Sequence, residues 1–131
     1  MKKLLLSLGA CLAIASASFS QTTLLGTNAG NVNTATSNTF IGSNAGLSNT
    51  SSNNNVAVGA NALKYQIDLA TFNIAIGANA GSGDGITTPT GGFNIFMGYG
   101  AGEKFTTGQN NVFIGYLSGI VNTSGQSNVF I

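Results

Sequence analysis

The sequence predicts an all-β fold in which short parallel strands stack into a repetitive β-roll, or β-solenoid. A five-residue motif, Asn-apolar-(Phe/Ala)-apolar-Gly, recurs through most of the chain. Glycine occurs 19 times in 131 residues and charged residues make up only 5%, which disfavours helices because Gly costs about 1 kcal/mol relative to Ala in a helix interior. Hydrophobic residues still reach 43%, so the chain has enough apolar surface to build a core.

Residues 1–20 have the pattern of a secretory signal peptide. Lys2 and Lys3 give a positive start, and residues 4–15 form an apolar run that is too short to span a bilayer. Small residues follow, which predicts Gln21 as the mature N-terminus. We therefore expect an exported protein, with no transmembrane segment in the mature chain.

The only cysteine, Cys11, lies inside this segment, so the mature chain has no thiol. Residues 8–11 also resemble a bacterial lipobox, in which Cys11 would carry a lipid. The apolar run continues past Cys11, which favours an ordinary signal peptide. Lipidation at Cys11 stays open as the alternative.

The mature chain carries few ionisable groups. Lys64 and Lys104 stand against Asp68, Asp84 and Glu103, which leaves a net charge of −1, and there is no His. No basic patch is available for nucleic acid, and neither paired carboxylates nor a nucleophile with a base can be assembled. We expect no enzyme, no cofactor and no metal site, and the sequence assigns no ligand-binding residue.

The copies of the motif are the expected strands, and together they make a repeat domain of residues 21–131. Each copy is a run of β-branched or aromatic residues, closed by Gly and followed by Asn, Ser and Thr, which is typical of a strand and then a turn. Successive glycines lie 16 to 21 residues apart. The last copy stops before its glycine, which suggests a fragment of a longer protein. The copies are residues 23–26, 38–42, 55–59, 73–77, 94–98, 111–115 and 128–131.

Side chains alternate along each strand, so Val and Ile point one way and Phe or Ala point the other. Both faces are apolar, which predicts a strand covered on both sides, as in parallel sheets. The motif asparagines would stack into a ladder, because an amide both donates and accepts. The ladder residues are Asn38, Asn55, Asn73, Asn94, Asn111 and Asn128, and the Phe/Ala residues are Phe40, Ala57, Ala75, Phe96, Phe113 and Phe130.

A small residue recurs three places after each glycine, which predicts a second, shorter strand or turn that passes close to the first. This segment has no row of large apolar side chains. We therefore expect neighbouring chains to cover the Phe/Ala face, most simply in a homotrimer. The small residues are Ala29, Ala45, Ala62, Ala80, Ala101 and Ser118.

The variable connections hold the remaining candidates. All five mature charges and Pro89 lie there, which predicts exposed loops. Asp84 lies in a Ser-Gly-Asp-Gly stretch that is better explained as a turn than as a calcium loop. The tyrosines are either contacts for a glycan or protein or packed against the roll, and packing is favoured. They are Tyr65, Tyr99 and Tyr116.

Residues 55–62 and 73–81 resemble the head repeats of YadA-like trimeric autotransporter adhesins, and the resemblance extends from about Leu24 to Ile131. It implies a left-handed parallel β-roll, three associated chains and attachment at a bacterial cell surface. The leading hypothesis is an exported structural adhesion module, cell-surface, outer-membrane-associated or extracellular, which binds an unidentified surface, protein or glycan.

The alternative is a passive fibre shaft. Similar repeats occur in surface and phage-tail-like fibres, so an anchor, a receptor-binding domain or a self-cleaving chaperone domain would then lie beyond residue 131. A flat array that binds ice or a crystalline glycan is a third reading. It needs an exposed row of Thr or Asn, and the Thr residues do not hold register.

Overall fold

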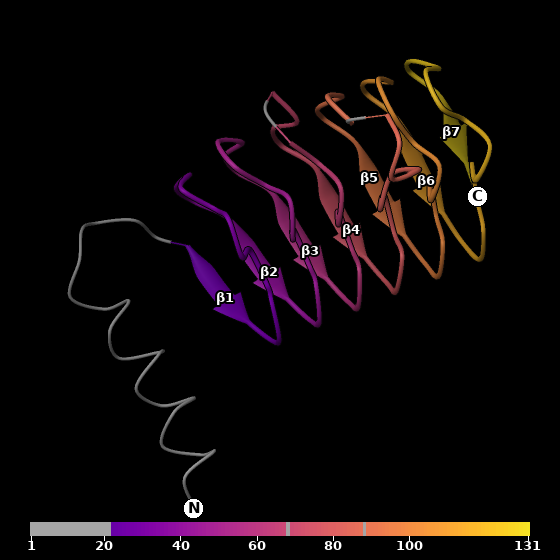
Figure 1. The fold of residues 1–131 in the computed structure, drawn as a ribbon. Helices are drawn as coiled ribbons and strands as arrows, with labels where there is room; N and C mark the ends of the chain where they lie inside the picture. The colour runs from indigo at the N-terminus through magenta and orange to yellow at the C-terminus, as the bar shows by residue number, and fades with distance from the viewer. Residues whose placement is uncertain (1–21, 68, 88) are drawn as a thin grey trace, which may run out of the picture.

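The protein is a solenoid of stacked coils, as described by a computed structural model for residues 22–131 apart from 68 and 88. Seven strands form one sheet in chain order, and each pairs in parallel with the next. Figure 1 shows them side by side, each contributed by one coil. The predicted all-β parallel solenoid is confirmed, while the predicted signal peptide and Cys11 lie outside the described residues. The strands are β1 (Thr23–Leu25), β2 (Thr39–Ile41), β3 (Val56–Val58), β4 (Ile74–Ile76), β5 (Ile95–Met97), β6 (Val112–Ile114) and β7 (Val129–Phe130).

The strands pair motif on motif in spite of their unequal connections. Phe40 lies opposite Ala57, Ala57 opposite Ala75, and Ala75 opposite Phe96. A shift of one residue would turn every side chain to the opposite face, so the register keeps like residues in rows along the sheet. The extra residues of the longer repeats are therefore confined to the connections.

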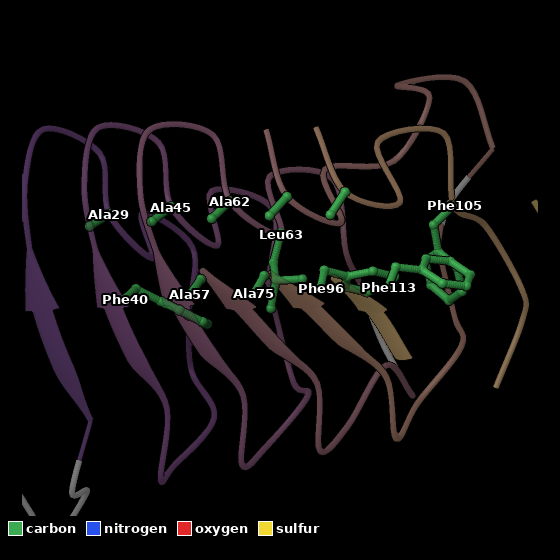
Figure 2. Packing of buried hydrophobic residues seen from close by; sticks show 12 residues of the cluster. Ala29, Phe40, Ala45, Ala57, Ala62, Leu63, Ala75, Phe96, Phe105 and Phe113 are labelled. Atoms are coloured by element: carbon green, nitrogen blue, oxygen red, sulfur yellow. The ribbon is translucent and has the colours of Figure 1, made fainter. Parts of the chain in front are cut away.

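The Phe/Ala row lies inside the coils, and the expectation that neighbouring chains cover it is wrong. The five residues of this row from β2 to β6 are completely buried, whereas Phe130 at the last strand is partly exposed. Their cover is the small-residue row of the same chain, and Figure 2 shows Ala29, Ala45 and Ala62 on the limb opposite the strands. One chain thus closes its own core.

Side-chain volume is balanced across this thin core. Opposite Phe40 and Phe96 the chain places Gly46 and Gly102, where an added Cβ would come within 2.6 Å and 2.4 Å of the rings. In the coil of β3 the strand residue is alanine, and Leu63 takes the position of these glycines and is fully buried. In these coils a large side chain on one limb faces a small one on the other, whereas in the coil of β4 both Ala75 and Gly81 are small, and Phe96 and Leu63 of the neighbouring coils lie against Gly81.

The inner Asn ladder, formed by the six motif asparagines, is present and contains a contact that the sequence did not predict. The side-chain Oδ1 of each of the first five accepts the backbone N–H of the ladder residue in the following coil, for example from Asn73 to Asn55 at 2.8 Å and from Asn94 to Asn73 at 2.9 Å. In the later coils Nδ2 also donates to the preceding Oδ1, as from Asn111 to Asn94 at 3.0 Å. The ladder therefore satisfies buried backbone groups and most of its own amides, although the buried Asn55 Nδ2 has no partner.

The second limb of each coil is a turn and not a strand. It passes close to its neighbours, as predicted, since Asn61 N–H donates to the Ser43 carbonyl at 2.8 Å. The chain enters it through the motif glycine, which for Gly59 has φ +133°. A Cβ there would lie 2.6 Å from the Gly77 carbonyl oxygen, so no larger residue fits without strain.

Candidate interaction surface

The Val/Ile side of the sheet points outward and forms the strand face, defined by the first and third residues of the strands. These side chains are half-buried or exposed in the described chain, with Ile76 40% and Ile114 37% exposed. The two rows are therefore interchanged relative to the prediction: the Phe/Ala row fills the coil, and the Val/Ile row is the outward one. The strand face of β2 to β6 consists of Thr39, Ile41, Val56, Val58, Ile74, Ile76, Ile95, Met97, Val112 and Ile114.

The strand face is continuous and uncharged. Seven strands at about 4.8 Å spacing extend over about 29 Å, and three residues give a width of about 10 Å, so the flat area is roughly 300 Å². Exposed apolar patches of this size on soluble proteins are often functional. Such a surface fits an apolar partner and offers no group for acid–base chemistry.

Two stacked aromatic pairs flank the strand face at opposite ends of the strands. Phe72 and Phe93 precede β4 and β5, lie 5.0 Å apart at 8°, and are 50% and 56% exposed. Tyr99 and Tyr116 follow β5 and β6 and lie 5.6 Å apart at 15°. The aromatic groups add to the outer surface and do not belong to the core.

The prediction that the tyrosines pack against the roll is wrong for two of them. Tyr99 is 51% and Tyr116 is 76% exposed, and each stacks on the other because both directly follow a motif glycine in consecutive coils. Tyr65 is half-buried, with the Lys64 ammonium 4.8 Å from its ring and Gly85 against its edge.

A second polar row, the outer Asn ladder, runs along the second limb. Asn28, Asn44, Asn61 and Asn79 have φ near +59°, and each of the first three donates from Nδ2 to the Oδ1 of the next at 3.1 to 3.2 Å. Asn28 is exposed and the others are half-buried. Sequence reasoning missed this row, although Asn precedes the small residue in four successive repeats. An Asn row in register therefore exists. The hypothesis of a flat array that binds ice or a crystalline glycan was disfavoured only because the Thr residues do not hold register.

The longest connection folds back onto its neighbour. Asp84 accepts the backbone N–H groups of Ile86 at 2.9 Å and Thr87 at 2.7 Å, and these two bonds hold the pKa of its carboxyl below the ordinary value. Asp84 is exposed, as expected, and forms a turn, whereas Pro89 is buried beside Gly83. Among the described residues there is no group of three His, Cys, Asp or Glu that could hold a metal ion.

The described part of the chain contains no helix that could serve as a membrane span. The outer surface of the described chain combines an apolar strand face, two aromatic pairs and a polar amide ladder. Comparison of the chain with family models, curated proteins and solved structures found no match.

Proposed function

We propose that this protein is an exported structural adhesion module of the bacterial surface, and that it acts as a self-associated assembly, most simply a homotrimer. Export is supported by the residue pattern of 1–20, and attachment by the resemblance of the repeats to YadA-like heads. The module contributes shape and surface rather than chemistry, and the proposal needs no cofactor.

The observation that carries the proposal is the continuous apolar strand face. The core inside the coils is closed by the chain itself, so the outward Val/Ile row is extra apolar surface that the fold does not need to bury. Burial of apolar surface stabilises association by about 25 cal/mol per Å² before the costs of binding are subtracted. Because the face is uncharged and every coil repeats it, the same faces of two further copies, arranged around a three-fold axis, are well-matched partners.

Self-association also suits adhesion. Several copies of one module present the same weak contacts many times, and linked contacts bind far more tightly than single ones. The polar outer ladder and the variable connections lie away from the strand face along the coil, so they stay available to an external surface when strand faces meet.

The test combines mass and attachment. Ile76→Glu places a charge in the middle of the strand face, and Ile86→Glu makes the same change in the long connection, where Ile86 is 90% exposed. We expect Ile76→Glu to give a folded monomer and to weaken attachment of cells that display the protein, whereas Ile86→Glu leaves both unchanged. An Ile76→Glu protein that associates and attaches like the wild type would refute the proposal.

A passive fibre shaft is the second candidate, favoured by the unbroken register from β1 to β7. A shaft needs the same self-association but no contact with a target. If Ile76→Glu abolishes association while cells that display the assembled wild-type protein show no attachment above cells without it, the shaft replaces the adhesin.

A further inference from the structure

We propose that the outer Asn ladder ends in a binding site for a neutral glycan, made by the Asn79 amide, the Tyr99 ring and the Glu103 carboxylate. The inference deepens the proposed adhesive function, on which it rests, by naming the chemistry of the target. It is carried by a break in the repeat between the coils of β4 and β5.

The first part of the site is the last rung of the ladder. The Nδ2 groups of the three earlier rungs donate toward the following coil, and the last of these bonds runs from Asn61 to Asn79 Oδ1 at 3.1 Å. The equivalent position in the coil of β5 is Gly100, which has no side chain to accept the next bond. The Nδ2 group of Asn79 is therefore directed along the ladder toward a position where the ladder offers no acceptor.

The second part of the site is the aromatic ring of Tyr99. Gly100 N–H donates to the Ala78 carbonyl at 2.9 Å, which places Tyr99 and Gly100 beside Ala78 and Asn79. The residues that precede the ladder in the earlier coils are small, so Tyr99 is the first large side chain in its row. One face of its ring stacks on Tyr116, the residue at the equivalent position of the preceding coil is the small Ala78, and Tyr99 is 51% exposed. That leaves an exposed aromatic face next to the end of the ladder.

The third part is a carboxylate at the same corner. The position that a Cβ of Gly100 would take lies 3.3 Å from Glu103 Oε2. Gly100 has φ +63°, and Leu117 closes the space beneath it, with Cδ2 2.6 Å from the same position. An amide donor, a carboxylate acceptor and a ring face therefore lie around one glycine.

These three groups match the chemistry of a sugar ring. A pyranose has an apolar face of C–H groups that packs on an aromatic ring, and a rim of hydroxyls that both donate and accept. The Asn79 amide can bind a hydroxyl oxygen, and the Glu103 carboxylate forms charge-assisted bonds with hydroxyl protons. An acidic ligand is disfavoured by Glu103 and by the mature net charge of −1, which selects a neutral glycan over an acidic one.

The site is compatible with an assembled protein. Asn79, Tyr99 and Glu103 follow the turn glycines Gly77 and Gly98, so they lie past the ends of β4 and β5 and outside the strand face as defined above. Association through the strand face thus leaves the end of the ladder open to an external glycan.

The test measures retention of the purified protein on insoluble cellulose, chitin, mannan and galactan, followed by titration with soluble oligosaccharides of whichever polymer binds. We expect the wild type to bind at least one polymer, and Tyr99→Ala to weaken that binding about tenfold. Glu103→Gln and Asn79→Gly, which suits the positive φ of this position, should each weaken it several-fold. Phe93→Asn is the matched control, since it removes an exposed aromatic ring elsewhere at a position that tolerates Asn, and it should bind like the wild type.

Several results would overturn the inference. They are a wild type that binds none of the polymers, binding that survives Tyr99→Ala, or equal losses for Tyr99→Ala and Phe93→Asn. Capture of a protein partner that requires Tyr99 but neither Asn79 nor Glu103 would also contradict a glycan. The mass of the same samples separates the two proposals, because a trimer that binds no glycan refutes only this site, and a monomer that binds glycan refutes only self-association.

Discussion

Removal of one rung from the inner Asn ladder should destabilise the protein far more than removal of one rung from the outer ladder. Asn73 is completely buried. Its Oδ1 accepts the backbone N–H of Asn94 at 2.9 Å, and its Nδ2 donates to the Gly91 carbonyl at 2.9 Å. Asn73→Ala leaves the Asn94 N–H and the Gly91 carbonyl without this side chain as a partner inside the coil, where water does not replace it.

The magnitude follows from those two groups. A buried polar group left without a partner costs about 1 to 3 kcal/mol, so Asn73→Ala should lower the free energy of unfolding by about 3 kcal/mol or more. Asn61→Gly is the control, because it removes two ladder bonds, of 3.2 Å and 3.1 Å, in a half-buried place, and Gly accepts φ +59°. Its cost should stay below about 1 kcal/mol.

The assay is urea unfolding followed by far-ultraviolet circular dichroism. It is run at two protein concentrations, because self-association adds to the apparent stability. The prediction is refuted if Asn73→Ala and Asn61→Gly lower the free energy of unfolding by amounts that agree within about 0.5 kcal/mol at both concentrations, which is the margin within which the effects of independent sites add.

Three further outcomes are expected. Phe96→Ala empties a fully buried place in the core and should cost about 3 to 5 kcal/mol in the same assay, and a cost below about 1 kcal/mol would show that the ring is not part of a packed interior. Gly59→Ala puts a Cβ 2.6 Å from the Gly77 carbonyl oxygen at φ +133°, so it should cost at least about 2 kcal/mol, whereas an unchanged unfolding midpoint would rule out this turn geometry. The Asp84 carboxyl should titrate by NMR below its ordinary pKa of 3.8, and because its folded pKa is lowered, the turn loses this stabilisation as the pH falls through the folded value; a midpoint at or above 3.8 contradicts the two backbone bonds to it.

The strand positions and the parallel register could be predicted from the motif, because like residues at a fixed place in each repeat have one way to stack. The side that faces inward could not be predicted from alternation alone, since both rows are apolar. The deciding signal lies on the other limb, where Gly46 and Gly102 stand opposite phenylalanines and Leu63 stands opposite an alanine. That compensation indicates which row fills the coil.

The outer surface was harder to predict because it depends on neighbours in adjacent coils. Tyr99 and Tyr116 are exposed, and they stack on each other because they occupy the same place in two consecutive repeats. The outer Asn ladder has the regular spacing that reveals such a row, since an Asn precedes the alanine in four successive repeats. The end of that ladder at Gly100 is a departure from the repeat, and such departures are where a repetitive scaffold can acquire a specific site.

The central claim, that the outward strand face joins copies of this chain, is tested most directly by the mass of the purified, folded protein in sedimentation equilibrium. Self-association through this face predicts a stable species of three times the chain mass that Ile76→Glu converts to a monomer. A wild-type protein that sediments as a folded monomer over the whole concentration range would contradict the claim.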